Sequence, residues 1–121
     1  MKAKLNYLHI APRKVRKVAD LIRNKPVKAA KVLLSFSKQK SARDLAKLLA
    51  SVVANAKHNF NKEENNLYVS KITVNEGPVF KRFIPKWRGT ADMIRKKTSH
   101  ISVTLSELPQ SKIENLKSKK Q

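Results

Sequence analysis

The chain has 121 residues and carries 28 Lys and Arg against 8 Asp and Glu, which gives a formal net charge of +20 at pH 7. It has no cysteine, which excludes disulfides, thiolate catalysis and the common zinc sites, and only two glycines, too few for a dinucleotide-binding or kinase-type glycine loop. No apolar run is long enough to span a membrane, and the first ten residues lack the apolar stretch of a secretory signal. We expect one small domain with a polyanionic partner, because so large a charge repels itself in a compact fold.

Residues 2–10 predict a short extended segment, because Ala3, Leu5 and Tyr7 stand at every second position and would share one face of a strand. A helix is predicted next over 12–23, with Pro12 at its start, where a proline is well tolerated. Its apolar stripe has helical spacing: Val15, Val18, Ala19 and Ile22. Asn24 suits the left-handed position that ends such a helix.

Two further helices are predicted. The first covers about 26–36 and turns four residues inward: Val27, Ala30, Leu33 and Leu34. The second covers about 42–59, with Ser41 as its N-cap and Asp44 three residues later in an arrangement like a capping box. Its apolar face has a clean 3.6-residue period: Leu45, Leu48, Leu49, Val52, Val53 and Ala56. This face and the stripe of the preceding 12–23 helix are expected to form one core.

Two β-rich segments follow the polar loop 61–66. Residues 67–75 are apolar at alternate positions, and the alternation slips at Ser70-Lys71, which predicts a β-bulge. Residues 101–105 alternate apolar side chains with Ser and Thr, a pattern typical of a half-buried strand. We expect a single domain over 1–109, ended by Pro109, and a flexible basic tail over 110–121.

The positive charge is concentrated in two segments. Residues 1–31 are rich in Lys and Arg and contain Asp20 as their only acid, and residues 79–97 likewise contain only Asp92. The intervening segment 41–76 is nearly balanced. A single basic run is usually a solvated face, but two such runs on either side of a neutral packing helix favour contact with nucleic-acid phosphates.

A catalytic or metal site is not indicated. The histidines lie far apart in the sequence: His9, His58 and His100. The acids are scattered, apart from Glu63-Glu64 in a loop. Ser99 directly precedes a histidine, but neighbouring residues of a strand face opposite sides and cannot form a triad by adjacency. We predict no enzyme activity, no cofactor and no metal.

Segment 79–98 mixes aromatic and basic residues around a turn bracketed by Pro85 and Gly89. Its aromatic residues are Phe80, Phe83 and Trp87. Folded back on itself, with arms of about ten residues, it would reach about 30 Å. One interpretation is an ordinary strand pair packed on the sheet. The other is an arm that leaves the globule and is held by RNA, with its aromatics on bases and its cations on phosphates.

Several motifs, in order over residues 3–107, together resemble the bacterial type of large-subunit ribosomal protein twenty-two. They are 11–25 (APRKVRKVADLIRNK), 54–59 (ANAKHN), 75–78 (NEGP), Lys81-Arg82, Pro85, Gly89 and 97–101 (KTSHI). The chain departs from that family at five positions. Asn24 stands where Gly is usual, Trp87 replaces a small residue, and lysine or threonine replaces Arg at the remaining three: Lys86, Lys97 and Thr90.

The resemblance implies an α+β fold, in which three helices pack on a small antiparallel β-sheet and a long β-hairpin, about 79–98, protrudes. It implies binding to the large-subunit (23S-type) rRNA early in assembly. The globule would lie near the exit of the nascent-peptide tunnel, and the hairpin tip would line the tunnel wall near its constriction. Changes in the hairpin are associated in the family with macrolide resistance.

The implied partners are the rRNA, neighbouring large-subunit proteins, and the nascent peptide and macrolides near the tip, with no membrane. The implied location is the large ribosomal subunit of the cytoplasm, or of an organelle. RNA contacts are expected from Arg13, Lys14, Arg16, Lys17, Arg23, Lys25, Lys81, Arg82, Arg95, Lys96, Lys97, Ser99 and His100. The tunnel-lining tip would comprise Lys86, Trp87, Arg88, Gly89 and Thr90. The alternative is a free nucleic-acid architectural or regulatory protein, which would not stay with large subunits through a salt wash.

Overall fold

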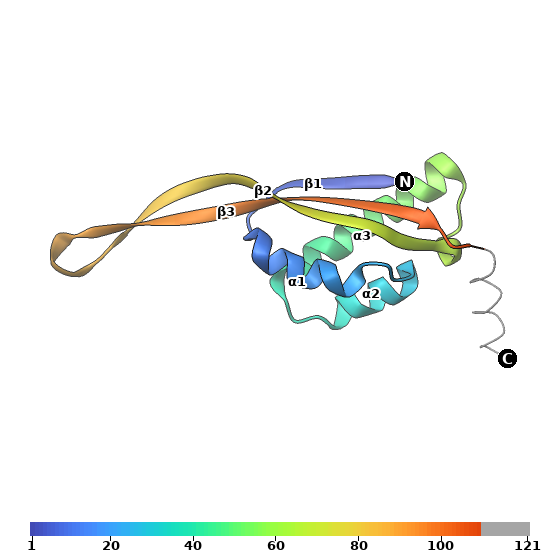
Figure 1. Ribbon diagram of the computed structural model, residues 1–121, viewed down its shortest axis with the longest axis horizontal. Helices are drawn as coiled ribbons and strands as arrows, with labels where there is room; N and C mark the ends of the chain where they lie inside the picture. Colours follow the sequence, from blue (N-terminus) through green and yellow to red (C-terminus); the bar gives the residue numbers. More distant parts are fainter. Residues whose placement is uncertain (110–121) are drawn as a thin grey trace.

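The computed structural model describes residues 1–109, so the predicted tail 110–121 lies outside the described residues. In chain order the elements are β1 (Lys2–Leu8), α1 (Pro12–Ile22), α2 (Val27–Phe36), α3 (Lys40–Phe60), the 3-10 turn η1 (Glu64–Asn66), β2 (Leu67–Pro85), the 3-10 turn η2 (Trp87–Gly89) and β3 (Ala91–Glu107). The helices gather on one side of the sheet, and β2 and β3 continue far beyond them (Figure 1). The predicted α+β architecture with a protruding hairpin is confirmed.

The sheet has the order β1-β3-β2, and all of its strands are antiparallel. β3 is central, so β2 has one edge that no strand within residues 1–109 covers. The segment that follows α1 covers part of this edge. The N–H of Asn24 donates to the Val69 carbonyl at 2.9 Å, and the N–H of Val69 donates to the Lys25 carbonyl at 3.0 Å. These bonds satisfy backbone groups that would otherwise be open to another strand.

The predicted bulge in β2 is confirmed, because the register against β3 shifts between Val69 and Lys71. Strand side chains alternate between faces, so one extra residue reverses the phase of everything after it. Without the bulge, either the apolar pair before it or the pair after it would face solvent. With it, all four are buried: Leu67, Val69, Ile72 and Val74.

The described residues form one hydrophobic core between the helices and the sheet. It includes the residues predicted to meet there: Val18, Ile22, Leu45, Leu49, Val52 and Val53. Leu33 of α2 was predicted to face inward, and this is wrong, because it is 40% exposed. The buried residues of α2 are Val27, Ala30 and Leu34, which form a narrow stripe along the helix. Leu33 lies outside this stripe, because consecutive residues of an α-helix point in different directions around its axis.

The predicted N-cap of α3 is also wrong. The helix begins at Lys40, its cap position is Gln39, and no side-chain hydrogen bond caps it. Ser41 instead lies within the first turn and is buried. The apolar stripe therefore starts at Ala42, three residues before Leu45, which the hydrophobic pattern gave as its first member.

The N-terminal alternation ends earlier than predicted. Ala3 and Leu5 pack against the core, but Tyr7 is 60% exposed and has a φ of 59°. The register of β1 against β3 shifts between Leu5 and Leu8, and Leu8 packs on the core instead. His100 explains the irregularity, since the Tyr7 N–H donates to its Nδ1 at 3.1 Å and the two rings meet edge to face at 4.9 Å.

Asparagines in the left-handed conformation follow two of the helices. Asn24, with a φ of 60°, follows the end of α1 as predicted, and Asn61, with a φ of 51°, ends α3. The side chain of asparagine tolerates this conformation better than most, which is why it can replace glycine there. After Asn61, the N–H of Lys62 donates back to the Ala56 carbonyl at 3.1 Å and closes the helix end.

The hairpin leaves the globule at a second irregularity in β2, between Glu76 and Val79. The buried hydroxyl of Thr98 on β3 donates to the Pro78 carbonyl at 2.7 Å and so fixes this point. Gly77 is needed here for space, because a Cβ at this position would lie 2.4 Å from the Thr98 Oγ1.

We expect Gly77→Ala to destabilise the protein by about 1–3 kcal/mol, the usual cost of forcing an extra methyl group into a packed site. Urea denaturation measures the change. The control is the same substitution in a Thr98→Ala background, which removes the hydroxyl that the methyl group would meet. The two substitutions should then cost less together than the sum of their separate costs. Additive costs would contradict the predicted clash.

Candidate nucleic-acid interface

The buried and exposed residues of α1 lie on opposite sides of the helix. Its apolar stripe is buried against the sheet and α3, so its cations lie on the outer side. The exposed cations of the helix are Arg13, Lys14, Arg16 and Lys17. Lys25, after the helix, is exposed as well. The structure thus places four of these predicted contact residues on one helix, whose apolar stripe is buried in the core, and the fifth just beyond its end.

Two arginines on the predicted contact surface also have a structural role that the sequence did not reveal. Arg16 donates from Nη2 to the Val74 carbonyl, and Arg23 donates from Nη2 to the Ile72 carbonyl, each at 3.2 Å. Both carbonyls lie on the open edge of β2. Arg23 also forms an ion pair with Asp20. A guanidinium has five N–H donors, so each arginine keeps donors for an external anion.

The hairpin brings two positive charges directly opposite one another, because Lys81 of β2 pairs with Arg95 of β3. The two lysines that follow Arg95 on β3 lie opposite apolar residues, Lys96 opposite Phe80 and Lys97 opposite Val79. All the predicted cations of the arms are exposed, Arg82 included. Like charges opposite one another across two strands are destabilising. A ribbon of this kind, with no core of its own, is better stabilised when an anion lies against it.

Ser99 and His100 have a different place from the other predicted contact residues. Ser99 has no exposed surface, and its hydroxyl donates to the Ile10 carbonyl. His100 is half-buried and accepts the Tyr7 N–H. Ser99 therefore ties the root of the hairpin to the β1–α1 connection, and His100 ties it to β1. Ser99 has no surface left for an RNA contact.

A groove of about 830 Å³ lies where the hairpin root meets the starts of α1 and α3. None of the described residues that line it is an Asp or Glu. Its cations come from four elements: Lys14, Lys17, Lys40, Arg82, Arg95, Lys96 and Lys97. Two ring systems, those of His9 and Phe80, lie in its wall, nearly parallel at 26° and 6.1 Å apart between centroids.

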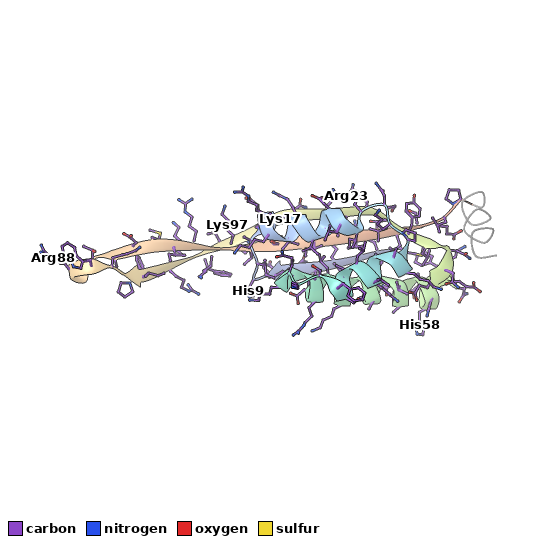
Figure 2. All side chains as sticks on the ribbon, turned by 90° about the horizontal axis from the view of Figure 1, so that it is seen from below. His9, Lys17, Arg23, His58, Arg88 and Lys97 are labelled. Atoms are coloured by element: carbon purple, nitrogen blue, oxygen red, sulfur yellow. The ribbon has the colours of Figure 1, made fainter. Side chains whose placement is uncertain are left out.

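Sequence reasoning gave no binding role to several residues of this groove, among them His9, Gln39 and Lys40. No local motif marks them, because they become neighbours of the hairpin only when the helices pack on the sheet. Figure 2 labels Lys17 and Lys97 near the hairpin root, with Arg88 at the far tip and His58 at the opposite end of the molecule. The basic surface therefore continues from α1 onto the hairpin.

The tip is a closed turn. The Lys86 N–H donates to the Thr90 carbonyl at 2.6 Å, and the Thr90 hydroxyl donates to the Trp87 carbonyl at 2.7 Å. Arg88 and Gly89 both have positive φ, at 56° and 74°. Trp87 is 77% exposed, and the Arg88 guanidinium lies 4.1 Å from the centroid of its ring, within cation–π range. The turn thus presents an aromatic and a cation outward together.

Residues 1–109 lack two features that would indicate other kinds of site. In this range no three His, Asp or Glu side chains gather closely enough to hold a metal ion. Nor does any helix in this range combine the length and hydrophobicity that crossing a bilayer requires.

Comparison with known proteins agrees with the resemblance noted in the sequence. A family model described as ribosomal protein L22p/L17e matches residues 3–106. The large ribosomal subunit protein uL22 of Caldicellulosiruptor saccharolyticus is 50% identical over 105 residues, which cover 87% of this chain and 86% of the relative. The uL22 proteins of Chloroflexus aggregans and Fusobacterium nucleatum are 45% and 47% identical, over 88% of this chain and 94% and 96% of theirs. The chain belongs to the ribosomal protein L22p/L17e family.

Proposed function

We propose that this protein is a structural, non-catalytic constituent of the large ribosomal subunit in the cytoplasm, and that it binds the rRNA of that subunit. Family membership supports the first part. The observation that carries the second is the placement of Lys81 directly opposite Arg95 on a hairpin that has no core of its own. The two cations repel each other when the protein is free, whereas a phosphate placed between them would attract both.

In this proposal α1 and the hairpin arms contact different parts of the rRNA. The cations of α1 bind rRNA phosphates at the globule, and the bonds from Arg16 and Arg23 to β2 hold this surface in place against the sheet. The arms then extend into the rRNA, with Lys81, Arg82 and Arg95 on phosphates. Phosphate contacts of this kind fix position and orientation rather than sequence. Such contacts, made early, would support assembly of the subunit.

The tip, 86–90, is proposed to line the wall of the nascent-peptide tunnel near its constriction, with the globule near the tunnel exit. Trp87 and Arg88 are exposed there, and their stacked pair offers a flat surface to a base, a peptide or a macrolide. Neighbouring large-subunit proteins are the other proposed partners.

Deletion of the tip, 86–90, tests this proposal. The pair Pro85 and Ala91 ends the ladder and would become the new turn, while no buried core residue is removed. The shortened protein should fold with nearly unchanged stability, since loop length affects closure entropy only slowly. It should also stay with large subunits through a salt wash, as the intact protein should. Macrolide sensitivity or nascent-chain stalling should change, and is measured in cells carrying only the shortened protein.

The control is Phe83→Leu, which alters an exposed aromatic residue of the arm and leaves the tip intact. It should keep the drug response of the intact protein. A shortened protein that unfolds, or that assembles with an unchanged response to drugs and stalling sequences, would refute the tunnel-wall role. Loss of the intact protein from salt-washed subunits would refute the ribosomal role itself and favour a free nucleic-acid-binding protein.

A further inference from the structure

We propose that the groove at the hairpin root holds one unpaired nucleotide of the RNA, with its base against the rings of His9 and Phe80 and its phosphate against the lysines of α1 and α3. This inference rests on the proposed function, because it names the RNA element that one part of the interface selects. Phosphate contacts elsewhere on the protein would bind paired and unpaired RNA alike.

The two rings are the first reason. His9 is exposed, Phe80 is 38% exposed, and their planes differ by only 26°. Every base has a flat π-face that can cover such a surface. Within an A-form helix the bases are stacked on one another and show only their edges, so a base that meets these rings must be unstacked and unpaired.

The charges around the rings are the second reason. Lys14 and Lys17 lie three residues apart on α1, which puts them on the same side of the helix, and Lys40 faces the same groove from the start of α3. The Arg82 guanidinium lies 5.8 Å from the centroid of the Phe80 ring. Cations therefore surround the rings, with no acidic side chain among the described residues of the lining. A nucleotide has the matching combination of a flat apolar face and a negative charge.

Size and rigidity are the third reason. The groove of about 830 Å³ lies within the usual range of roughly 300–1,000 Å³ for sites that enclose a small ligand. Its two rings are held before any ligand arrives. Phe80 is paired in the ladder with Lys96, and the residue after His9 is fixed by a bond from Ser99 to the Ile10 carbonyl. A preformed site loses little conformational entropy on binding.

Gln39 adds a hydrogen-bonding group to the groove, because its side-chain amide can donate to and accept from the edge of a base.

The test compares two synthetic RNA hairpins that carry the same single-nucleotide bulge. In one the bulge is an adenosine, and in the other it is an abasic residue, so the phosphates are identical and one base is missing. The full-length protein should bind the first about tenfold more tightly, the effect expected of one base on an aromatic surface. The double variant His9→Ala and Phe80→Leu should bind the two RNAs equally, with an affinity close to that of the intact protein for the abasic hairpin.

Phe36→Leu is the matched control, because Phe36 at the end of α2 is 82% exposed but does not line the groove. It should keep the tenfold preference. The inference is overturned if the intact protein binds both hairpins equally, if the double variant keeps the preference, or if Phe36→Leu loses it. Should the double variant fail to fold, as judged by circular dichroism, each single variant is expected to lose part of the preference, and unchanged preference in both would overturn the inference. Failure of the intact protein to bind either hairpin would instead refute RNA binding itself.

Discussion

The affinity of the isolated protein for large-subunit rRNA is expected to fall about a thousandfold or more as salt is raised from about 50 to 200 mM, given roughly six to ten phosphate contacts. Each cation that binds a phosphate releases condensed counterions, and this release becomes less favourable as salt increases. The exposed cations of α1 and of the hairpin arms are numerous enough to make that many contacts. Filter binding over a series of salt concentrations measures the slope. A flat dependence would contradict the proposed phosphate contacts.

Single substitutions locate the contacts on the surface. Lys81→Gln should lower the salt slope by about one unit, because it removes one phosphate contact. Lys57→Gln is the matched control. Lys57 is exposed in the last turn of α3, next to His58, which Figure 2 places at the end of the molecule away from the hairpin. The control should leave the slope unchanged. Equal effects of the two substitutions would mean that the RNA responds to total charge rather than to this surface.

Leu49→Ala is expected to destabilise the protein by about 2–5 kcal/mol, the range for removing a large buried side chain. Leu49 has no exposed surface and belongs to the core between α3 and the sheet. The loss includes both the transfer free energy of the removed atoms and the cavity that remains. Because small domains are stable by only about 5–15 kcal/mol, this single change removes a large part of the total. Urea denaturation at equilibrium measures it.

Leu21→Ala provides the matched control, since the chemical change is identical but the side chain is 49% exposed on α1. Its cost should be well below that of Leu49→Ala, because much of its surface meets water in both states. A loss of less than about half a kcal/mol at Leu49, the level of ordinary surface substitutions, would mean that α3 does not direct this face into the core.

Periodic features were predictable from the sequence because each is set by neighbours within a few residues. The face of α3 around Leu49 follows from its 3.6-residue spacing, and the bulge at Ser70-Lys71 follows from the break in a two-residue alternation. The turn between Pro85 and Gly89 follows from residues suited to tight backbone geometry.

Errors arose where a tertiary contact overrode a local preference. Ser41 had a good capping sequence, yet the packing of α3 on the sheet extended the helix and buried the serine. Tyr7 continued an apolar alternation, yet its contact with His100, far away in the sequence, turned it outward. Leu33 fits a broad apolar stripe, but α2 buries only a narrow one.

The sequence by itself determined the charge, the helical and strand periodicities, and the motifs that led to the family. Composition and spacing are properties of the chain whatever its conformation, so they can be known before it folds. Only the tertiary structure decided that Arg16 and Arg23 close the open edge of β2, and that His9 lies beside Phe80 in a basic groove. Each of these residues is about 50 to 70 positions away from its partner in the sequence. Contacts over such separations depend on which surfaces meet when the helices pack on the sheet, and a local sequence pattern does not show this.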